Sequence, residues 1–266
     1  MSYIEANKAA WEEAFDNRFP NWGDDDHERL KDGRFALLNE AVRRELEAID
    51  LNGKTVAQFC CNNGGELLSL VLGSGASHGV GFDIAENIIG QARETAVKTG
   101  IENCDFAAYN ILDIPEGYHS RFDFIFFTIG AIIWFEDLRL LFEKTAKCLK
   151  TGGLLLINDF HPVMNMLALP GDDCFDQSRL DRFAYSYFTR EPWVTNDGMG
   201  YMTDKYESKP FTSYSHTMSA IVNALSEHRI KTIKLNEYDS SDDDGLTGVY
   251  KNKGIPLSFV LIAEKS

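Results

Sequence analysis

The feature that most constrains the fold is an alternation of short apolar runs with amphipathic segments between residues 55 and 159. The runs have the length and near-continuous apolar character of buried strands, and the segments between them repeat apolar residues at helical spacing. Such alternation indicates a doubly wound α/β fold, in which helices cover both faces of a mostly parallel sheet. The pattern predicts strands at 55–61, 78–82, 104–109, 122–128 and 153–159, and helices at 65–72, 85–99 and 137–149.

The first apolar run ends in a turn built from asparagine and glycine. Residues 62–65 read Asn-Asn-Gly-Gly and separate the strand from a segment that resumes helical spacing at Leu67. These residue types tolerate positive φ angles, and glycine lets a ligand come close to the backbone. A tight corner of this kind points helix N-terminal N–H groups at whatever lies above the strand. We expect a ligand-binding turn here, and an ordinary strand-to-helix turn is the alternative.

The N-terminal fifty residues are predicted to be helical. Trp11 and Phe15 lie one turn apart, and apolar residues recur at the same spacings after a break at Pro20–Gly23. We expect residues 1–50 to form a helical cover, and residues 51–266 to form the main domain.

Regular patterning is lost again between residues 161 and 213, where prolines and aromatic residues accumulate. A loop-rich insert of this length inside a compact domain is usually functional, most often as a lid. Beyond it we predict an amphipathic helix at 215–228 and strands at 230–238 and 256–264. The link between these two strands is short enough for an antiparallel pair.

The charge of the chain limits its partners. A formal net charge of −15 repels phosphate backbones, and no basic cluster offsets it, so we expect no nucleic-acid partner. The acidic runs Asp24–Asp26 and Asp242–Asp244 lack the spacing and glycine of a calcium loop. We interpret them as solvated loops and expect no metal site.

Membrane and redox signals are also missing from the sequence. No apolar run approaches the roughly 18 residues of a membrane span, and the first residues contain no signal-peptide core, so we expect a cytoplasmic protein without a membrane partner. The cysteines are odd in number and form no C-x-x-C pair, which favours reduced thiols over disulfides or zinc ligands.

Asp83 is the strongest single candidate for ligand binding. It closes the second predicted strand, about twenty residues beyond the first turn, where nucleotide-binding α/β folds place a carboxylate that accepts hydrogen bonds from ribose hydroxyls. The alternative is an N-cap for the helix at Glu86. Asn110 ends the third strand, and with Ile111 it offers an amide and a backbone N–H to a purine edge.

At this point the sequence resembles the class I S-adenosylmethionine-dependent methyltransferases, from about Lys54 to Pro162 and more loosely to the C-terminus. Residues 56–64, Val-Ala-Gln-Phe-Cys-Cys-Asn-Asn-Gly, are similar to the first family motif, an acid-bearing strand that runs into G-x-G-x-G. Gln58 stands at the acid position, and Cys60 and Asn62 replace the first two glycines. This variant is similar to a bacterial small-molecule-type subgroup whose substrates are largely unassigned.

The later motifs follow in the family order. Asp83 matches the ribose-binding acid, and residues 122–128 resemble the fourth strand, whose end meets the methionine moiety. Residues 149–154 resemble the L-x-P-G-G turn, with Thr151 in place of proline. The resemblance implies a seven-stranded Rossmann-like methyltransferase sheet with an antiparallel C-terminal strand. It implies S-adenosylmethionine as cofactor, S-adenosylhomocysteine as product and cofactor contacts at Gln58, Cys60, Asn62, Asn63, Gly64, Asp83, Ile84, Asn110, Ile111, Thr128 and Trp11.

The acceptor side offers weaker signals. His161 follows the fifth strand, and a histidine there can take a proton from an oxygen or nitrogen nucleophile, so we name it as a catalytic candidate. The alternative is a structural histidine that caps the strand. We expect Trp134, Tyr201 and His216 to join it in an acceptor pocket walled by the insert. Aromatic residues of a lid also commonly form its own small core.

Three functions from different classes follow from these residues. The leading hypothesis is methyl transfer from S-adenosylmethionine to a small-molecule acceptor, by in-line displacement in a closed apolar pocket. The second is a non-catalytic domain that binds the cofactor or its product as a sensor or partner subunit, which the altered first motif suggests. The third is an NAD-dependent oxidoreductase, which the absence of G-x-G-x-x-G opposes. The acceptor and the oligomeric state stay open.

Overall fold

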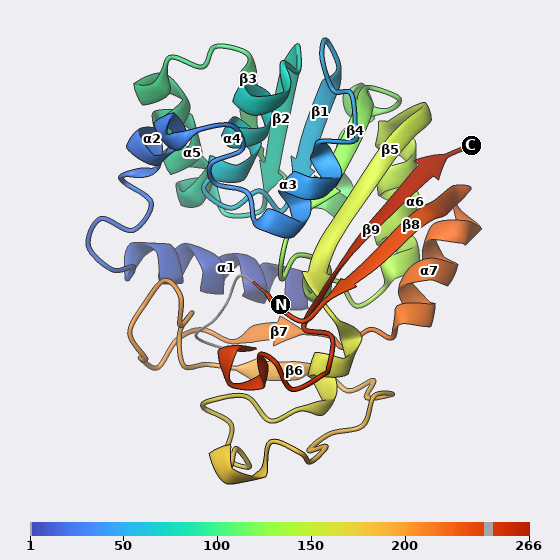
Figure 1. Cartoon of the computed structure of the whole chain (residues 1–266). Helices are drawn as coiled ribbons and strands as arrows, with labels where there is room; N and C mark the ends of the chain where they lie inside the picture. The colour runs from blue at the N-terminus through green and yellow to red at the C-terminus, as the bar shows by residue number, and fades with distance from the viewer. Residues whose placement is uncertain (1, 242–246) are drawn as a thin grey trace.

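A seven-stranded sheet forms the centre of the protein (Figure 1). The computed structural model describes residues 2–241 and 247–266. The five strands from β1 to β5 run parallel, and β9 runs antiparallel to both β5 and β8. This arrangement confirms the expected doubly wound fold with an antiparallel C-terminal strand. The strand order is β3 (Cys104–Ala108), β2 (His78–Asp83), β1 (Thr55–Phe59), β4 (Phe122–Phe127), β5 (Leu149–Phe160), β9 (Ser258–Lys265) and β8 (Ile230–Tyr238).

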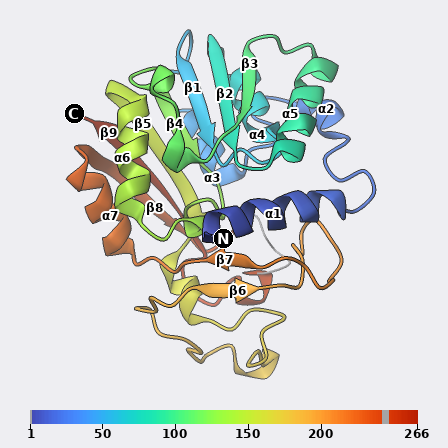
Figure 2. The ribbon, with the colours of Figure 1, turned by 180° about the vertical axis from the view of Figure 1, so that it is seen from behind.

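The order of the strands places a ligand-binding crevice between β1 and β4. The chain runs from β1 outward through β2 to β3 and then returns to β4 on the other side of β1. The connections leave in opposite directions at this switch point, so open α/β sheets bind ligands there, outside the carboxyl ends of the strands. Helix α1 (Tyr3–Asp16) crosses these ends in both views of the molecule (Figures 1 and 2).

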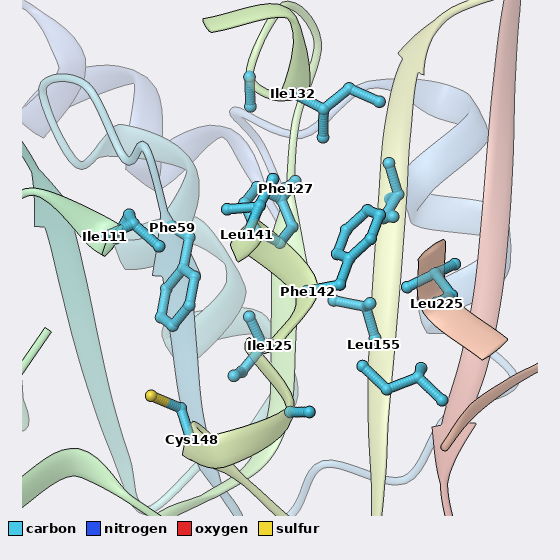
Figure 3. Packing of buried hydrophobic residues seen from close by; sticks show 14 of the residues in the cluster. Phe59, Ile111, Ile125, Phe127, Ile132, Leu141, Phe142, Cys148, Leu155 and Leu225 are labelled. Carbon is cyan, nitrogen blue, oxygen red and sulfur yellow. The ribbon is translucent and has the colours of Figure 1, made fainter. Parts of the chain in front are cut away.

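Two hydrophobic cores cover the two faces of the sheet. Phe124 and Phe126 of β4 pack with residues from α3 (Glu40–Leu46), α4 (Gly65–Ser74) and α5 (Glu86–Thr99). Ile125 and Phe127 of the same strand point to the opposite face, which α6 (Leu138–Cys148) and α7 (Met218–Glu227) cover (Figure 3). Successive strand residues point to opposite faces, so a strand buried on both sides must be apolar throughout. This burial explains the continuous apolar runs in the sequence.

The predicted helices and strands are present with small shifts at their ends. Helix α7 begins at Met218, three residues later than the prediction, because the Thr217 hydroxyl accepts a hydrogen bond from the Ala220 N–H and caps the helix. The turn predicted at residues 149–154 is part of β5. Leu149 pairs with Phe122, the register then shifts, and Gly152 adopts a φ of 74°.

The N-terminal region folds as predicted into separate helical pieces. Helix α1 packs its buried face against α5 and against the insert, and α2 (Asp26–Arg29) and α3 follow it. Asn7 is buried, and its side chain both donates to the Thr212 carbonyl (2.8 Å) and accepts from the Thr212 N–H (2.7 Å). An amide side chain of α1 therefore pairs with the backbone of the insert as a neighbouring strand would.

The insert, residues 161–213, is largely irregular, as its loss of periodicity indicates. It contains short 3₁₀ helices and a separate antiparallel pair, β6 (Trp193–Thr195) with β7 (Phe211–Ser213), which the sequence did not predict. The pair lies beside α1, on the side away from the sheet (Figure 1).

The first acidic run, Asp24–Asp26, is partly buried in the structure. Asp26 is not solvated: it is only 4% exposed, and its carboxylate accepts hydrogen bonds from the side chains of Asn63 and Arg29. That interpretation was wrong for Asp26, because Asn63 of the first turn holds its carboxylate, whereas Asp24 and Asp25 are exposed. The run Asp242–Asp244 lies outside the described residues.

Within the described ranges, no group of metal-ligating side chains is present, and no helix is long and apolar enough to cross a membrane.

Candidate active site

The turn after β1 keeps the backbone geometry of a glycine-rich loop although two of its residues carry side chains. Cys60 has a φ of 57° and Asn62 a φ of 49°, and Gly64 follows at 76° as the left-handed N-cap of α4. Glycine adopts such angles freely, whereas other L-residues pay about 1–2 kcal/mol, with asparagine the most tolerant. A β-carbon at Gly64 would lie 2.4 Å from the Phe106 ring. The fold therefore demands glycine at position 64 and accepts side chains at the other two.

Asp83 fixes the position of this turn. Its carboxylate accepts hydrogen bonds from the backbone N–H of Asn62 (2.9 Å) and of Ala85 (3.1 Å). Burial raises the pKa of Asp83, and the hydrogen bonds from backbone N–H groups oppose that shift. Helix α5 has Ala85 as its N-cap and no side-chain cap, so the N-cap alternative for Asp83 is wrong. The carboxylate thus lies at the end of β2, next to the turn, where a ribose site was predicted.

A polar cluster lies between the ends of β1 and β4. The Gln58 amide nitrogen donates to the Glu66 carboxylate (2.6 Å) and approaches the Thr128 hydroxyl (3.1 Å), which itself donates to the same Glu66 oxygen (2.6 Å). Gln58 is completely buried and Thr128 is 7% exposed. Among the described residues, no group donates a hydrogen bond to the Gln58 carbonyl oxygen. The switch point therefore contains a buried acceptor available to a ligand.

The expected purine-binding residues are held by local contacts. The Asn110 side chain accepts from the Leu112 N–H and donates to the Asp113 carboxylate, so it caps a short 3₁₀ helix. Ile111 is buried in the core beneath the sheet edge, whereas Ile84 is partly exposed directly after Asp83. The structure brings these residues to the same edge of the sheet, and their contact with the cofactor stays a prediction.

An aromatic cluster covers the turn from the side of α1 and the insert. The Trp11 ring lies 5.4 Å from both Trp134 and Phe211, and Tyr201 lies 6.2 Å from Trp22, measured between ring centroids. The side-chain amide of Asn62 donates to the Tyr201 hydroxyl (2.9 Å). The N-terminal helix, the loop after β4 and the insert thus meet over the first turn.

A cavity of about 220 Å³ lies on the insert side, next to the ends of β4 and β5. Much of its lining is apolar, and its polar side chains include those of Asp159, Asn165, Asp172, Tyr185, His216 and Thr247. Further lining residues are Ile132, Ile133, Phe160, Met164, Leu167, Leu169, Trp193 and Ile221. The size and composition suit a small molecule with an apolar body and polar groups.

Asp159 is the polar residue of the cavity that is held most firmly. It is the penultimate residue of β5 and is 1% exposed. Its carboxylate accepts hydrogen bonds from the backbone N–H groups of Gly130, Ile132 and Phe160. Burial raises its pKa to about 6, although these N–H groups favour the ionised form. The carboxyl group is therefore poised to exchange a proton near neutral pH.

His216 reaches the cavity from the segment that precedes α7. Its Nε2 lies 2.9 Å from the Phe135 carbonyl, and burial lowers its pKa although the carbonyls of Phe135 and Ile132 oppose that shift. The ring is therefore neutral at pH 7. Of the four residues predicted to form the acceptor pocket, His216 is the one that lines this cavity, while Trp134 and Tyr201 belong to the aromatic cluster.

His161 lies outside the group of residues that line the cavity. Its Nδ1 accepts from the Val163 N–H (3.2 Å), its Nε2 lies 2.8 Å from the Glu237 carboxylate, and its side chain is 7% exposed. Burial lowers its pKa, and the Glu237 charge opposes that shift. Both ring nitrogens are thus engaged within the fold. This arrangement favours the structural interpretation that the sequence left open.

Two residues of the site were not identified from the sequence. Asp159 was assigned to the end of the fifth strand without a role, although a charged residue directly after the apolar run Leu154–Ile157 and Asn158 was a visible signal. Glu66 appeared as the first polar residue of a helix, and no spacing rule connects it with Thr128. Only the fold brings α4 and the end of β4 together.

The residues at the switch point fit a cofactor with a nucleoside and an amino-acid part. A carboxylate at the end of β2 suits ribose hydroxyls, and the unpartnered buried oxygen of Gln58 suits a donor such as an amino group. The fold and the site together define an α/β enzyme that binds a nucleoside cofactor at the switch point.

Comparisons with known proteins agree with this class. A family model described as a methyltransferase domain matches residues 51–196, more than half of the chain. The chain belongs to this family, and it is an S-adenosylmethionine-dependent methyltransferase. This membership excludes the NAD-dependent oxidoreductase. An uncharacterized protein of Haemophilus influenzae is 25% identical over 235 residues, which cover 84% of this chain and 87% of the relative.

Solved structures share the fold at low sequence identity. An S-adenosylmethionine-dependent methyltransferase from Mesorhizobium loti gives a TM-score of 0.57 at 16% identity and covers 85% of this chain and 99% of its own. Geranyl diphosphate C-methyltransferase from Streptomyces coelicolor A3(2), solved with Mg²⁺, geranyl diphosphate and S-adenosylhomocysteine, gives a TM-score of 0.61 at 13% identity. It covers 100% of this chain and 98% of its own.

Proposed function

We propose that the protein transfers the methyl group of S-adenosylmethionine to a small, mainly apolar acceptor that binds in the cavity beneath the insert. The observation that carries the proposal is the cavity of about 220 Å³, apolar except for a few groups that include Asp159 and His216. The net charge of −15 also argues against a phosphate-bearing polymer as acceptor. The geranyl diphosphate enzyme, which shares the fold, acts on a molecule of this general size class.

The chain contributes mainly alignment and exclusion of water. When bound, S-adenosylmethionine supplies a methyl group on a positively charged sulfur. The residues that would hold it are the turn 60–64, Asp83 and the cluster around Gln58. Holding an acceptor in line can contribute on the order of 7–11 kcal/mol, which is enough for large acceleration without a strong catalytic base.

Asp159 and His216 have different roles toward the acceptor. At pH 7 most of the Asp159 carboxyl is ionised, because its pKa is about 6, so this lining residue can receive a proton from the acceptor. His216 is neutral, and its ring is held by the backbone carbonyls of Phe135 and Ile132, so it is suited to position the acceptor. The sequence-based choice of His161 as base is not part of this proposal, since its ring nitrogens are engaged elsewhere.

We further propose that α1 and the insert act together as the cover of the site. Asn7 bonds the Thr212 backbone, the Lys209 N–H donates to the Glu13 carboxylate (2.8 Å), and Trp11 packs against Phe211. A cover joined in this way would open and close as one unit. Its closure would exclude water from the cofactor and from the acceptor together.

The test combines a panel of acceptors with a variant that fills the cavity. The protein is incubated with S-adenosylmethionine and either small apolar alcohols, amines and acids or nucleic acid and unfolded protein, and release of S-adenosylhomocysteine is measured. Leu169→Trp places a ring in the cavity lining and should abolish turnover while calorimetry shows unchanged S-adenosylhomocysteine affinity. Leu180→Trp is the matched control, because Leu180 packs in the same small cluster outside the lining.

The results separate the alternatives. Product release with the small molecules alone, lost in Leu169→Trp and kept in Leu180→Trp, supports the proposal. Turnover with a polymer, or full activity of Leu169→Trp, would refute the placement of the acceptor. Tight binding of S-adenosylhomocysteine without turnover on any acceptor would favour the sensor alternative instead.

A further inference from the structure

We propose that Glu66, held in place by Gln58 and Thr128, binds the positively charged amino group of the cofactor, and so replaces the acid that the family motif carries on the first strand. This inference concerns the cofactor and is independent of the proposed acceptor. In this chain the strand position is occupied by the neutral Gln58, and the negative charge has moved to the first turn of α4.

Geometry brings the three side chains to one point from three elements. Gln58 is the penultimate residue of β1, Glu66 is the second residue of α4, and Thr128 directly follows β4. One Glu66 oxygen accepts from both neighbours at 2.6 Å. This point is the switch between β1 and β4, where open α/β sheets bind their ligands. By resemblance, the end of the fourth strand also meets the methionine part of the cofactor.

The hydrogen bonds determine which way the Gln58 amide faces. Its nitrogen must point to the Glu66 carboxylate, because the reverse orientation would place two acceptor oxygens against each other. The amide oxygen is then left buried, with no donor among the residues that the structure describes. A buried acceptor without a donor costs roughly 1–3 kcal/mol. An ammonium group, which has three donors, can satisfy this oxygen and the carboxylate together.

A structural role for Glu66 is the competing explanation. A carboxylate in the first turn of a helix interacts favourably with the helix dipole, and it also holds Gln58 and Thr128. Such a role would affect every ligand of the turn equally, because it acts through the shape of the site. Recognition of the amino group would affect only ligands that carry one.

The decisive experiment compares two neutral-sulfur ligands by calorimetry. S-adenosylhomocysteine carries the amino-acid part, whereas 5′-methylthioadenosine has the same nucleoside without it, and neither has the sulfonium charge. Glu66→Gln should weaken S-adenosylhomocysteine at least about tenfold, as expected for a lost charge-assisted hydrogen bond, and leave 5′-methylthioadenosine unchanged. Glu40→Gln is the matched control: Glu40 is an exposed acid in the first turn of α3, and its removal should change neither affinity.

A charge swap tests the replacement directly. Gln58→Glu combined with Glu66→Gln returns the acid to the strand and should restore most of the lost S-adenosylhomocysteine affinity. Thermal melts identify any variant that fails to fold, and Glu66→Asp, which keeps the charge on a shorter side chain, then serves in its place with a smaller but equally selective loss. Equal weakening of both ligands, or no loss of either, would overturn the proposal.

Discussion

The cofactor side and the acceptor side of this site are built from contacts of very different range. On the cofactor side, Gln58 and Glu66 are eight positions apart, and Asp83 bonds Asn62 across 21 positions. On the acceptor side, His216 contacts Phe135 across 81 positions and Asn7 bonds Thr212 across 205. The difference teaches that the cofactor side combines short-range contacts of strand ends and turns with a longer contact between Glu66 and Thr128, whereas the acceptor side exists only when distant segments pack.

The two sides of the site should also differ in how strongly single substitutions change the stability of the fold. A local turn concentrates its requirements in single backbone positions, so one substitution can destroy it. The acceptor side divides its stability among several hydrogen bonds and apolar contacts, so single changes there should have smaller effects on folding. Three substitutions, taken from the largest expected effect to the smallest, can break or sharpen the comparison.

Gly64→Ala should have the largest effect on stability. Its β-carbon would meet the Phe106 ring at 2.4 Å and the Ala92 β-carbon at 2.8 Å, and a left-handed φ of 76° disfavours alanine. Strain and overpacking together predict a loss of about 2–5 kcal/mol in the free energy of unfolding, measured by urea titration. Gly90→Ala is the control: nothing lies within 4 Å of its β-carbon in α5, so it should stabilise by about 0.5–1 kcal/mol. A mild Gly64→Ala would contradict the local basis of the turn.

Asp159→Asn should change the pH dependence of stability. The folded-state pKa of about 6 lies above the ordinary aspartic acid value of 3.8, so the folded protein binds the proton more tightly than the unfolded chain. Stability from this group is therefore present below about pH 4 and is lost as pH rises to about 6. The loss amounts to about 3 kcal/mol, because one pKa unit corresponds to about 1.4 kcal/mol.

The measurement is the difference between the parent and Asp159→Asn in urea unfolding at pH 4, 5, 6 and 7. Between about pH 4 and pH 6, the free energy of unfolding of the variant should rise relative to that of the parent by about 3 kcal/mol. Above pH 6 the difference between the two proteins should stay constant. Asp137→Asn is the control, because Asp137 is an exposed N-cap of α6 and its carboxyl is not buried. A parallel pair of pH profiles for Asp159→Asn and the parent would show that the carboxyl is not perturbed.

Asn7→Ala should have the smallest effect, and it probes the longest contact. It removes two hydrogen bonds to the Thr212 backbone and should cost about 1–3 kcal/mol in the free energy of unfolding. Hydrogen exchange should increase in β6, β7 and α1 while the sheet core stays protected. Lys8 is the neighbour of Asn7 on the exposed side of α1, so Lys8→Ala should change neither the free energy of unfolding nor the hydrogen exchange. Increased exchange throughout the sheet would show that the cover and the core are a single cooperative unit.

The sequence alone determined the sheet, the turn after β1 and the place of Asp83 at the end of β2. Fully apolar strands alternating with amphipathic helices allow one architecture, since a strand covered on both faces cannot carry alternating polarity. The turn at 62–65 and Asp83 are readable because the carboxyl ends of parallel strands meet at one edge, whatever the rest of the chain does. The helical N-terminus and the irregular insert were predictable because the spacing of apolar residues, or its loss, can be read within each segment.

Only the tertiary structure decided which residues face the acceptor. His161 and Asp159 are only two positions apart, but β5 ends at Phe160 between them. Asp159 lines the cavity, whereas His161 caps the following 3₁₀ helix and pairs with Glu237. His216 lies just before α7, which packs against α6 and β8, and Glu66 reaches Thr128 because β1 and β4 are neighbours in the sheet. Contacts at such separations depend on the packing of whole elements, and no residue pattern within one element encodes the partner that packing will supply.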